Sequence, residues 1–220
     1  PDAFYRGEIA KKIVKEMESN GGLISAEDLK NYMPVERPPV EGTYKNFKIV
    51  SMPPASSGGI HLIQMLNMIE EFPIKDMGFG SADSIHILAE VMKRAYADRS
   101  KHLGDMDFYD VPSSLMSKEY SSFLNKSISV NSRTASKDVF AGDPYPYESP
   151  DTTHFSVMDQ YGNAVSNTYT LNFSYGSGIM IPGTGMLMNN EMDDFSSKPG
   201  VPNGYGLLGS EANSIQANKR

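Results

Sequence analysis

The sequence predicts an α+β protein, because it combines helical spacing of apolar residues with the alternation that is typical of β-hairpins. The helical spacing is clearest over residues 4–18 and 81–101. The alternation is clearest over residues 154–172, on either side of the turn-forming stretch Gln160–Asn163. With 220 residues, the chain is long enough for one domain with a substantial core or for two small ones.

The N-terminal part of the chain is predicted to form an amphipathic helix and a shorter helix after it. Over residues 4–18, one apolar stripe contains Ile9, Ile13, Val14 and Met17. The stretch Asn20-Gly21-Gly22 is expected to end this helix. Ser25 begins a capping signal for the short second helix.

Two strands and another helix are predicted next. Residues 40–52 suit two strands joined at Lys45-Asn46, because several residues that prefer β-structure follow this turn. The loop 53–59, PPASSGG, leads into a helix at about 60–71. The N–H groups of this loop could face an anion at the start of the helix. A serine cap followed by two flexible glycines is the favoured interpretation.

The second long helix is predicted from Ser81 to about Lys101. Its apolar face is expected to contain Ile85, Leu88, Ala89, Met92 and Tyr96. The charged residues expected to meet water are Lys93, Arg94, Asp98 and Arg99.

A polar, turn-rich segment, residues 127–151, precedes the hairpin at 154–172 and is easier to expose than to bury. On the second strand of that hairpin, one face is predicted to carry Ser166, Thr168, Thr170 and Asn172. A face this polar is either solvated or lines a site. Loops are expected to dominate residues 176–220, which carry many glycines and an acidic cluster at 191–194.

The composition argues against several kinds of partner and site. The chain has 20 basic and 27 acidic residues, a net charge of −7, and no basic run, which argues against a nucleic-acid partner. No apolar segment is long enough to span a membrane. The lack of cysteine excludes disulfides, thiolate metal sites and a cysteine nucleophile. His61, His86 and His102 lack the spacing of metal ligands and are interpreted as structural, so no metal or other cofactor is predicted.

The stretch Thr152-Thr153-His154, where the polar segment meets the hairpin, admits two interpretations. A threonine hydroxyl is a poor nucleophile, but an N-terminal threonine carries its own base, an α-amino group with a pKa of about 8. Thr152 becomes N-terminal only if the Asp151–Thr152 bond breaks, and the exposed segment before it suits such a cut. On the pattern alone, an ordinary strand start is the favoured interpretation. Similarly, NNEMDDF at 189–195, taken alone, favours a solvated acidic turn over part of a site.

Longer motifs resemble the γ-glutamyltransferase (γ-glutamyl transpeptidase) family over essentially all 220 residues. In the second half these motifs are TTHFSVMDQYGNAVSNTYTLN, GSGIM, LMNNEMDDFSSKPGVPN and YGLLGSEAN. In the first half they are FYRGEIAKKIVKEM, NGGLISAEDLKNY, IVSMPPASSGGIH and AYADRSKHLGD. The resemblance implies the N-terminal nucleophile hydrolase fold, a four-layer αββα sandwich that this chain would contain as a fragment.

The resemblance also implies a precursor, or zymogen, that acts as its own protease and cuts itself between Asp151 and Thr152. Residues 1–151 would then be the C-terminal part of a large subunit, with an exposed processing loop at about 127–151. Residues 152–220 would be the N-terminal part of a small subunit in the same αββα domain. Thr152 would also be the catalytic nucleophile. It would take the γ-glutamyl group from glutathione or another donor and pass it to an amino acid, a peptide or water.

Four further positions match functional positions of the family. The resemblance implies that Thr170 hydrogen-bonds the nucleophile and its new α-amino group. It implies that Asn172, Glu191 and Asp194 hold the α-ammonium group of the donor. Two carboxylates and an asparagine supply the charge and the acceptors that a buried ammonium needs. Thr153 and His154 are expected to pack and position the nucleophile, and His154 is not assigned as a base.

The family's carboxylate-binding arginine, its Ser-Ser pair and its oxyanion-hole glycines would lie outside residues 1–220. The chain alone is therefore expected to be inactive or nearly so. A periplasmic or secreted location is expected from the resemblance alone. Two alternatives remain. One is a related acylase or poly-γ-glutamate depolymerase of the same fold, and the other is an inactive member that serves as a binding or assembly module.

Overall fold

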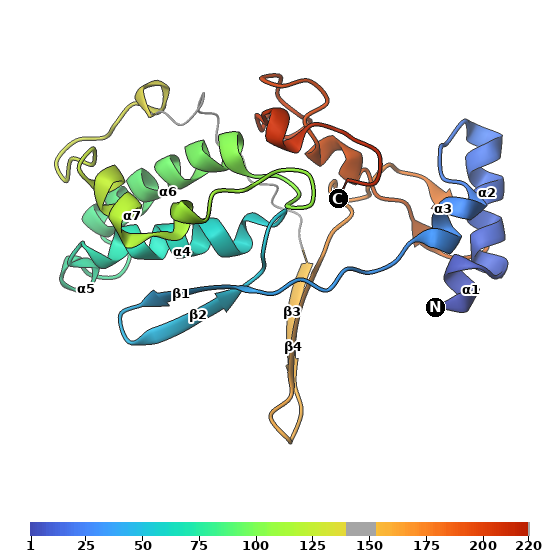
Figure 1. Cartoon of the computed structure of the whole chain (residues 1–220), viewed down its shortest axis with the longest axis horizontal. Coiled ribbons are helices and arrows are strands. Elements are labelled where there is room, and N and C mark those ends of the chain that lie inside the picture. The colour runs from blue at the N-terminus through green and yellow to red at the C-terminus, as the bar shows by residue number, and fades with distance from the viewer. Residues whose placement is uncertain (140–152, 220) are drawn as a thin grey trace. The chain divides into compact units, whose positions relative to one another are not determined.

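The computed structural model describes residues 1–139 and 153–219 (Figure 1). The chain divides into two compact units. The first unit contains Pro1–Glu36 and the described part of Ser149–Asp194, and the second contains the described parts of Arg37–Glu148 and Phe195–Arg220. Each unit combines helices with two-stranded antiparallel sheets, which confirms the α+β prediction.

Three helices begin the first unit: α1 (Asp2–Tyr5), α2 (Glu8–Asn20) and α3 (Ala26–Asn31). The single helix predicted over 4–18 is therefore interrupted, at Gly7. A Cβ atom on Gly7 would lie 2.9 Å from the Cα of Ala3, so only glycine fits this junction. The end of α2 is as predicted, because Gly21 has a left-handed φ of 71° and its N–H bonds the Met17 carbonyl. Ser25 caps α3 through a reciprocal capping box with Asp28, also as predicted.

The core of the first unit joins α2 to a short hairpin, formed by β5 (Met180–Ile181) and β6 (Met186–Leu187). Ile181 is completely buried and packs with Ile13 and Met17 of α2. Lys12 of α2 also donates a hydrogen bond, from its Nζ to the carbonyl oxygen of Gly183 at 3.0 Å. The chain just before the acidic cluster at 191–194 is therefore held against α2.

The predicted hairpin at 154–172 is present as β3 (Thr153–Met158) and β4 (Ala164–Tyr169). The Asp159 side chain accepts hydrogen bonds from the N–H groups of Tyr161 and Asn163 and so closes the turn. The predicted polar face is shorter than expected, because β4 ends at Tyr169 and Asn172 has a left-handed φ of 70°. Within the strand, this face keeps Ser166 and Thr168.

In the second unit, β1 (Val40–Tyr44) and β2 (Phe47–Ser51) form the hairpin predicted around Lys45-Asn46, and it packs on α4 (Ser57–Glu70). Gly59 permits this close packing, since a Cβ atom there would lie 1.9 Å from the carbonyl oxygen of Met52. The Ser56 hydroxyl accepts a hydrogen bond from the Gly58 N–H at 3.1 Å. The serine-cap interpretation of this loop is therefore confirmed.

The remaining helices of this unit are α5 (Ile74–Met77), α6 (Ala82–His102) and α7 (Lys118–Asn125), and α4 contacts both α6 and α7 (Figure 1). Short 3₁₀ turns lie at Ser113–Met116, Ser136–Asp138 and Glu211–Asn213. Met68 of α4 and Ile87 and Val91 of α6 form the buried centre of the unit.

The buried face of α6 differs from the prediction. Ile85, Leu88 and Met92 are 57%, 39% and 41% exposed, whereas Ile87 and Val91 are almost completely buried. Arg94 and Asp98, which were expected to meet water, are 4% and 1% exposed. Both have polar partners inside the unit: Arg94 pairs with Glu90, and Asp98 accepts hydrogen bonds from Gln64 and Tyr120. Satisfied polar groups of this kind are tolerated in a core.

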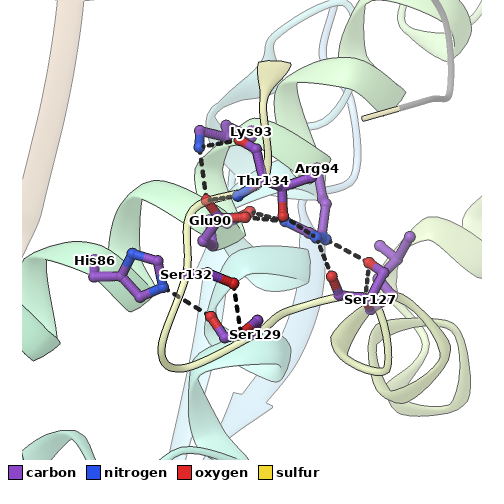
Figure 2. Close-up of polar contacts among 9 residues, drawn as sticks. His86, Glu90, Lys93, Arg94, Ser127, Ser129, Ser132 and Thr134 are labelled. Atoms are coloured by element: carbon purple, nitrogen blue, oxygen red, sulfur yellow. Dashed lines mark hydrogen bonds and ion pairs between the residues drawn. The ribbon is translucent and has the colours of Figure 1, made fainter. Parts of the chain in front are cut away.

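The same helix anchors the beginning of the polar segment 127–151. Figure 2 shows Glu90, Lys93 and Arg94 of α6 gathered against Ser127 and Thr134. Arg94 donates to the Ser127 carbonyl oxygen at 2.7 Å, and Lys93 donates to the Thr134 carbonyl oxygen at 2.8 Å. Glu90 accepts from the Thr134 N–H at 3.0 Å. Many side chains of 127–139 are exposed, as predicted, but the backbone is tied down at two points. Residues 140–152 lie outside the described part of the chain.

Candidate active site

The candidate site lies in the first unit, where the chain leaves β4 and meets the 3₁₀ turn Glu191–Asp194. Three hydrogen bonds to Asn190 join these segments. Its N–H bonds the Leu171 carbonyl oxygen at 3.1 Å, and its own carbonyl oxygen accepts from the Asn172 side chain at 3.1 Å. Its side-chain oxygen accepts from the Phe173 N–H at 3.0 Å. Segments almost twenty residues apart are thus fastened at one residue.

Asn172 is the centre of the arrangement, being 3% exposed and in the left-handed region. Asparagine adopts this conformation more readily than most residues with a Cβ atom. The backbone N–H of Asn172 donates to Thr170 Oγ1 at 2.9 Å, which fixes the direction of the threonine hydroxyl. The same backbone also hydrogen-bonds the Glu191 carboxylate. The turn after β4 therefore links a hydroxyl to a carboxylate.

The 3₁₀ turn places the carboxyl groups of Glu191 and Asp194 beside each other. Burial raises the pKa of Glu191 to about 7, together with the negative charge of Asp194 and a hydrogen bond to it. Glu191 Oε1 is buried and has no hydrogen-bond partner among the described residues. A carboxyl pair that holds a proton and keeps an unused acceptor atom is well suited to receive a cationic group.

The structure thus connects four of the predicted site residues in one chain of contacts, from Thr170 through Asn172 and Glu191 to Asp194. The other two, Asp151 and Thr152, lie outside the described residues.

Sequence reasoning missed Asn190, which holds the two segments together. The available signal was its place next to Glu191 in the motif NNEMDDF.

The described residues contain neither a metal-ligand cluster nor a membrane-spanning helix. No group of three or more His, Asp and Glu in residues 1–139 and 153–219 lies close enough to hold a metal ion. No helix in this part of the chain combines the length and apolar character needed to cross a membrane. His61 and His86 have structural contacts, with Gln64 Oε1 and the Ser129 carbonyl oxygen respectively, each at 2.8 Å.

The fold is that of an N-terminal nucleophile hydrolase. The family model for gamma-glutamyltranspeptidase matches residues 1–220. The chain therefore belongs to the γ-glutamyltranspeptidase family, as its motifs predicted.

Among its relatives, the "Glutathione hydrolase proenzyme" of Escherichia coli (strain K12) is 53% identical over 221 residues. That match covers 100% of this chain and 38% of the relative. The "Acylase ACY 1 proenzyme" of Pseudomonas sp. (strain SE83) is 41% identical over 91% of this chain and 35% of its own length. The chain thus spans less than two fifths of these relatives.

Solved structures agree with this assignment and with the predicted fold. A cephalosporin acylase from Bacillus halodurans matches with a TM-score of 0.78 and 27% identity, over 100% of this chain and 37% of that protein. The γ-glutamyltranspeptidase of Helicobacter pylori matches with a TM-score of 0.62 and 42% identity, over 68% of this chain and 43% of that protein.

Proposed function

We propose that the protein transfers γ-glutamyl groups from glutathione and other γ-glutamyl compounds to amino acids, peptides or water. Family membership and the names of the glutathione hydrolase relatives support this proposal. The observation that carries it is the connected series Thr170, Asn172, Glu191 and Asp194 at the end of β4. This series combines a fixed hydroxyl group with a carboxyl pair suited to an ammonium group.

The first proposed reaction is maturation of a precursor. The Thr152 hydroxyl attacks the carbonyl carbon of Asp151, and the peptide C–N bond breaks as its nitrogen takes a proton and becomes the α-amino group of Thr152. Water then hydrolyses the resulting ester, which leaves a carboxylate on Asp151 and restores the hydroxyl. Residues 1–151 and 152–220 would then belong to two subunits that stay together. The word "proenzyme" in the names of several relatives supports this step.

The second proposed reaction uses the new α-amino group as the base. It takes the proton of the Thr152 hydroxyl while the oxygen attacks the γ-carbonyl of the donor. The proton passes to the leaving amine, and a γ-glutamyl ester of Thr152 remains. Water or an acceptor amine then attacks this ester. In the register of the hairpin, Thr153 pairs with Tyr169, so Thr170 comes directly after the last residue pair of the ladder.

The carboxyl pair has the role of holding the donor. The α-ammonium group of the γ-glutamyl donor would displace the proton shared by Glu191 and Asp194 and bind Glu191 Oε1, an acceptor with no partner in the described part of the chain. Charge-assisted hydrogen bonds of this kind are about twice as strong as neutral ones. The fixed turn at Asn172 keeps this ammonium site at a constant distance from the Thr170 hydroxyl.

Intact-mass measurement of the full-length protein tests the proposal. We expect wild type to separate into two polypeptides, with the second beginning at Thr152, and to release glutamate from glutathione. Thr152→Ala should stay as one polypeptide without activity, whereas Thr152→Ser, which keeps a hydroxyl, should still cut itself. An uncut wild-type protein that turns over glutathione would contradict the proposal.

A related acylase is the second candidate, because the chain is 41% identical to the "Acylase ACY 1 proenzyme" of Pseudomonas sp. (strain SE83). A glutaryl side chain has no ammonium group, so the carboxyl pair of Glu191 and Asp194 favours the γ-glutamyl substrate. Rates on γ-glutamyl and glutaryl anilides decide between them, since an acylase would prefer the glutaryl compound.

A further inference from the structure

The polar face of the β3–β4 hairpin carries hydrogen bonds that the proposed mechanism does not use. His154 Nδ1 lies 2.7 Å from Thr168 Oγ1, and His154 Nε2 lies 3.0 Å from Ser166 Oγ. Ser156 Oγ completes the group, 3.2 Å from Ser166 Oγ. One imidazole ring on β3 therefore contacts two hydroxyl groups on β4.

Both ring nitrogens of His154 are engaged in these contacts. In a neutral imidazole one nitrogen donates and the other accepts, and a serine or threonine hydroxyl can serve either of them. The ring is therefore held in one orientation by β4, and it orients the Thr168 hydroxyl in return. A ring bonded at both nitrogens has no nitrogen left to take a proton from a substrate, which favours a positioning role.

The cross-link lies next to the candidate active site. His154 and Thr168 are partners in the hairpin register, and the pair that follows, Thr153 and Tyr169, is the last pair of the ladder. Thr170 comes directly after it, and its hydroxyl is bonded by the Asn172 N–H at 2.9 Å. The orientation of Thr168 is thus set two residues before the hydroxyl that the mechanism requires.

We propose that His154 is a positioning residue, which acts through Thr168 to hold Thr170 at a fixed distance from the start of β3. This inference rests on the proposed function, because it gives Thr170 a role beside the nucleophile. A displacement of about 1 Å in a reacting group can cost as much as about a hundredfold in rate. Loss of the cross-link should therefore slow the chemical step and leave donor binding at Glu191 and Asp194 intact.

The test uses the full-length protein and measures kcat, KM and the rate of self-cleavage. We expect His154→Ala to lower kcat about ten- to hundredfold, with KM changed less than about twofold. His154→Asn places an amide near the position of Nδ1 and should recover part of kcat through Thr168. His154→Gln reaches toward Ser166 and should recover less. Val157→Ala, a change on the opposite face of the same strand, is the control and should stay near wild type.

A double-mutant cycle between His154 and Thr168 shows whether the two residues act together. Thr168→Val keeps the shape of the side chain and removes the hydroxyl. If His154 acts through Thr168, the double variant should be no slower than the slower single variant. Rate losses that multiply would overturn the inference, as would a His154→Ala variant with unchanged kcat or with a raised KM alone.

Three further outcomes have defined meanings. If His154→Ala fails to fold, by its thermal unfolding midpoint, then His154→Asn and Thr168→Val carry the same test. If Thr152→Ala is inactive while the His154 and Thr168 variants match wild type, the inference fails and the proposed function stands. If Thr152→Ala keeps full activity, the proposed function itself fails.

Discussion

Arg94 and Glu90 form an ion pair on the buried face of α6, with Arg94 Nη1 2.8 Å from Glu90 Oε2. Their side chains are 4% and 1% exposed. Both also reach the segment after α7: Arg94 bonds the carbonyl and hydroxyl oxygens of Ser127, and Glu90 accepts from the Thr134 N–H (Figure 2). The pair therefore fastens the chain that leads toward residue 140 to the centre of its unit.

Removal of one partner of this pair should be strongly destabilising. Arg94→Met leaves the Glu90 charge buried with Lys93 as its remaining cation, and loss of a buried partner typically costs about 3–5 kcal/mol. Arg6 and Asp2 offer a matched control, because they form an i,i+4 pair at the same 2.8 Å distance but are 56% and 86% exposed. Arg6→Met should cost about 0.5 kcal/mol or less. Denaturant unfolding of both variants measures the difference, and equal losses would contradict the prediction.

Acid should also weaken this part of the structure. Burial tends to raise the pKa of Glu90, but hydrogen bonds from Lys93, Arg94 and Thr134 outweigh it and lower the pKa from 4.5 to about 2. A lowered carboxyl pKa stabilises the folded state above the unfolded value and loses this effect as pH falls. The free energy of unfolding should therefore drop between pH 4.5 and about 2. The drop should be shallower in Arg94→Met, which unfolding curves measured over this pH range would show. Identical slopes would contradict the attribution of the drop to Glu90.

The predicted and observed buried faces of α6 differ. Local signals predicted helix ends correctly at Gly21, Ser25 and Ser56, because a cap depends on residues within one turn. The prediction of the buried face of α6 was wrong because Arg94 and Asp98 have hydrogen-bond partners that are distant in sequence. Helical periodicity contains no information about such partners, so a polar residue was assigned to the surface.

Two isoleucines test the corrected face of α6 directly. Ile87 is 1% exposed and packs with Met68 and Val91, whereas Ile85 is 57% exposed. Ile87→Ala should cost about 2–5 kcal/mol, and Ile85→Ala should cost about 1 kcal/mol or less. The change in helix propensity is the same at both sites and cancels in the comparison. Equal losses in the free energy of unfolding, or a larger loss for Ile85→Ala, would instead support the buried face that helical periodicity predicted.

Motif resemblance named the members of the candidate site, but it could not give the contacts that join them. Motif resemblance identified Thr170, Asn172, Glu191 and Asp194, and the structure links them. Strand alternation placed Asn172 on one face with Thr168, but the left-handed φ of 70° at Asn172 ends that alternation. This turn and its bonds to Asn190 bring the carboxyl pair to the end of β4. A backbone conformation set by long-range contacts is not readable from a two-residue period.

The raised pKa of Glu191 should make the free energy of unfolding change with pH in the opposite direction to the lowered pKa of Glu90. Because the folded pKa is about 7 and the ordinary value is 4.5, the free energy of unfolding should fall as pH rises between these values. A ligand that carries an ammonium group prefers the ionised carboxyl pair. Its affinity should therefore increase as pH rises through about 7, with release of a proton on binding below that pH.

Calorimetric titration of the full-length protein with glutamate, whose ammonium group stays charged over this range, measures that affinity and the released protons. Asp194→Asn removes the charge repulsion that helps to raise the pKa of Glu191, so binding should weaken and its pH dependence should move below pH 7. Asp193→Asn removes the same charge from the same 3₁₀ turn, yet Asp193 is not among the groups that raise this pKa. Its pH dependence should therefore match wild type. An affinity independent of pH, or an equal displacement in both variants, would rule out the carboxyl pair as the ammonium site.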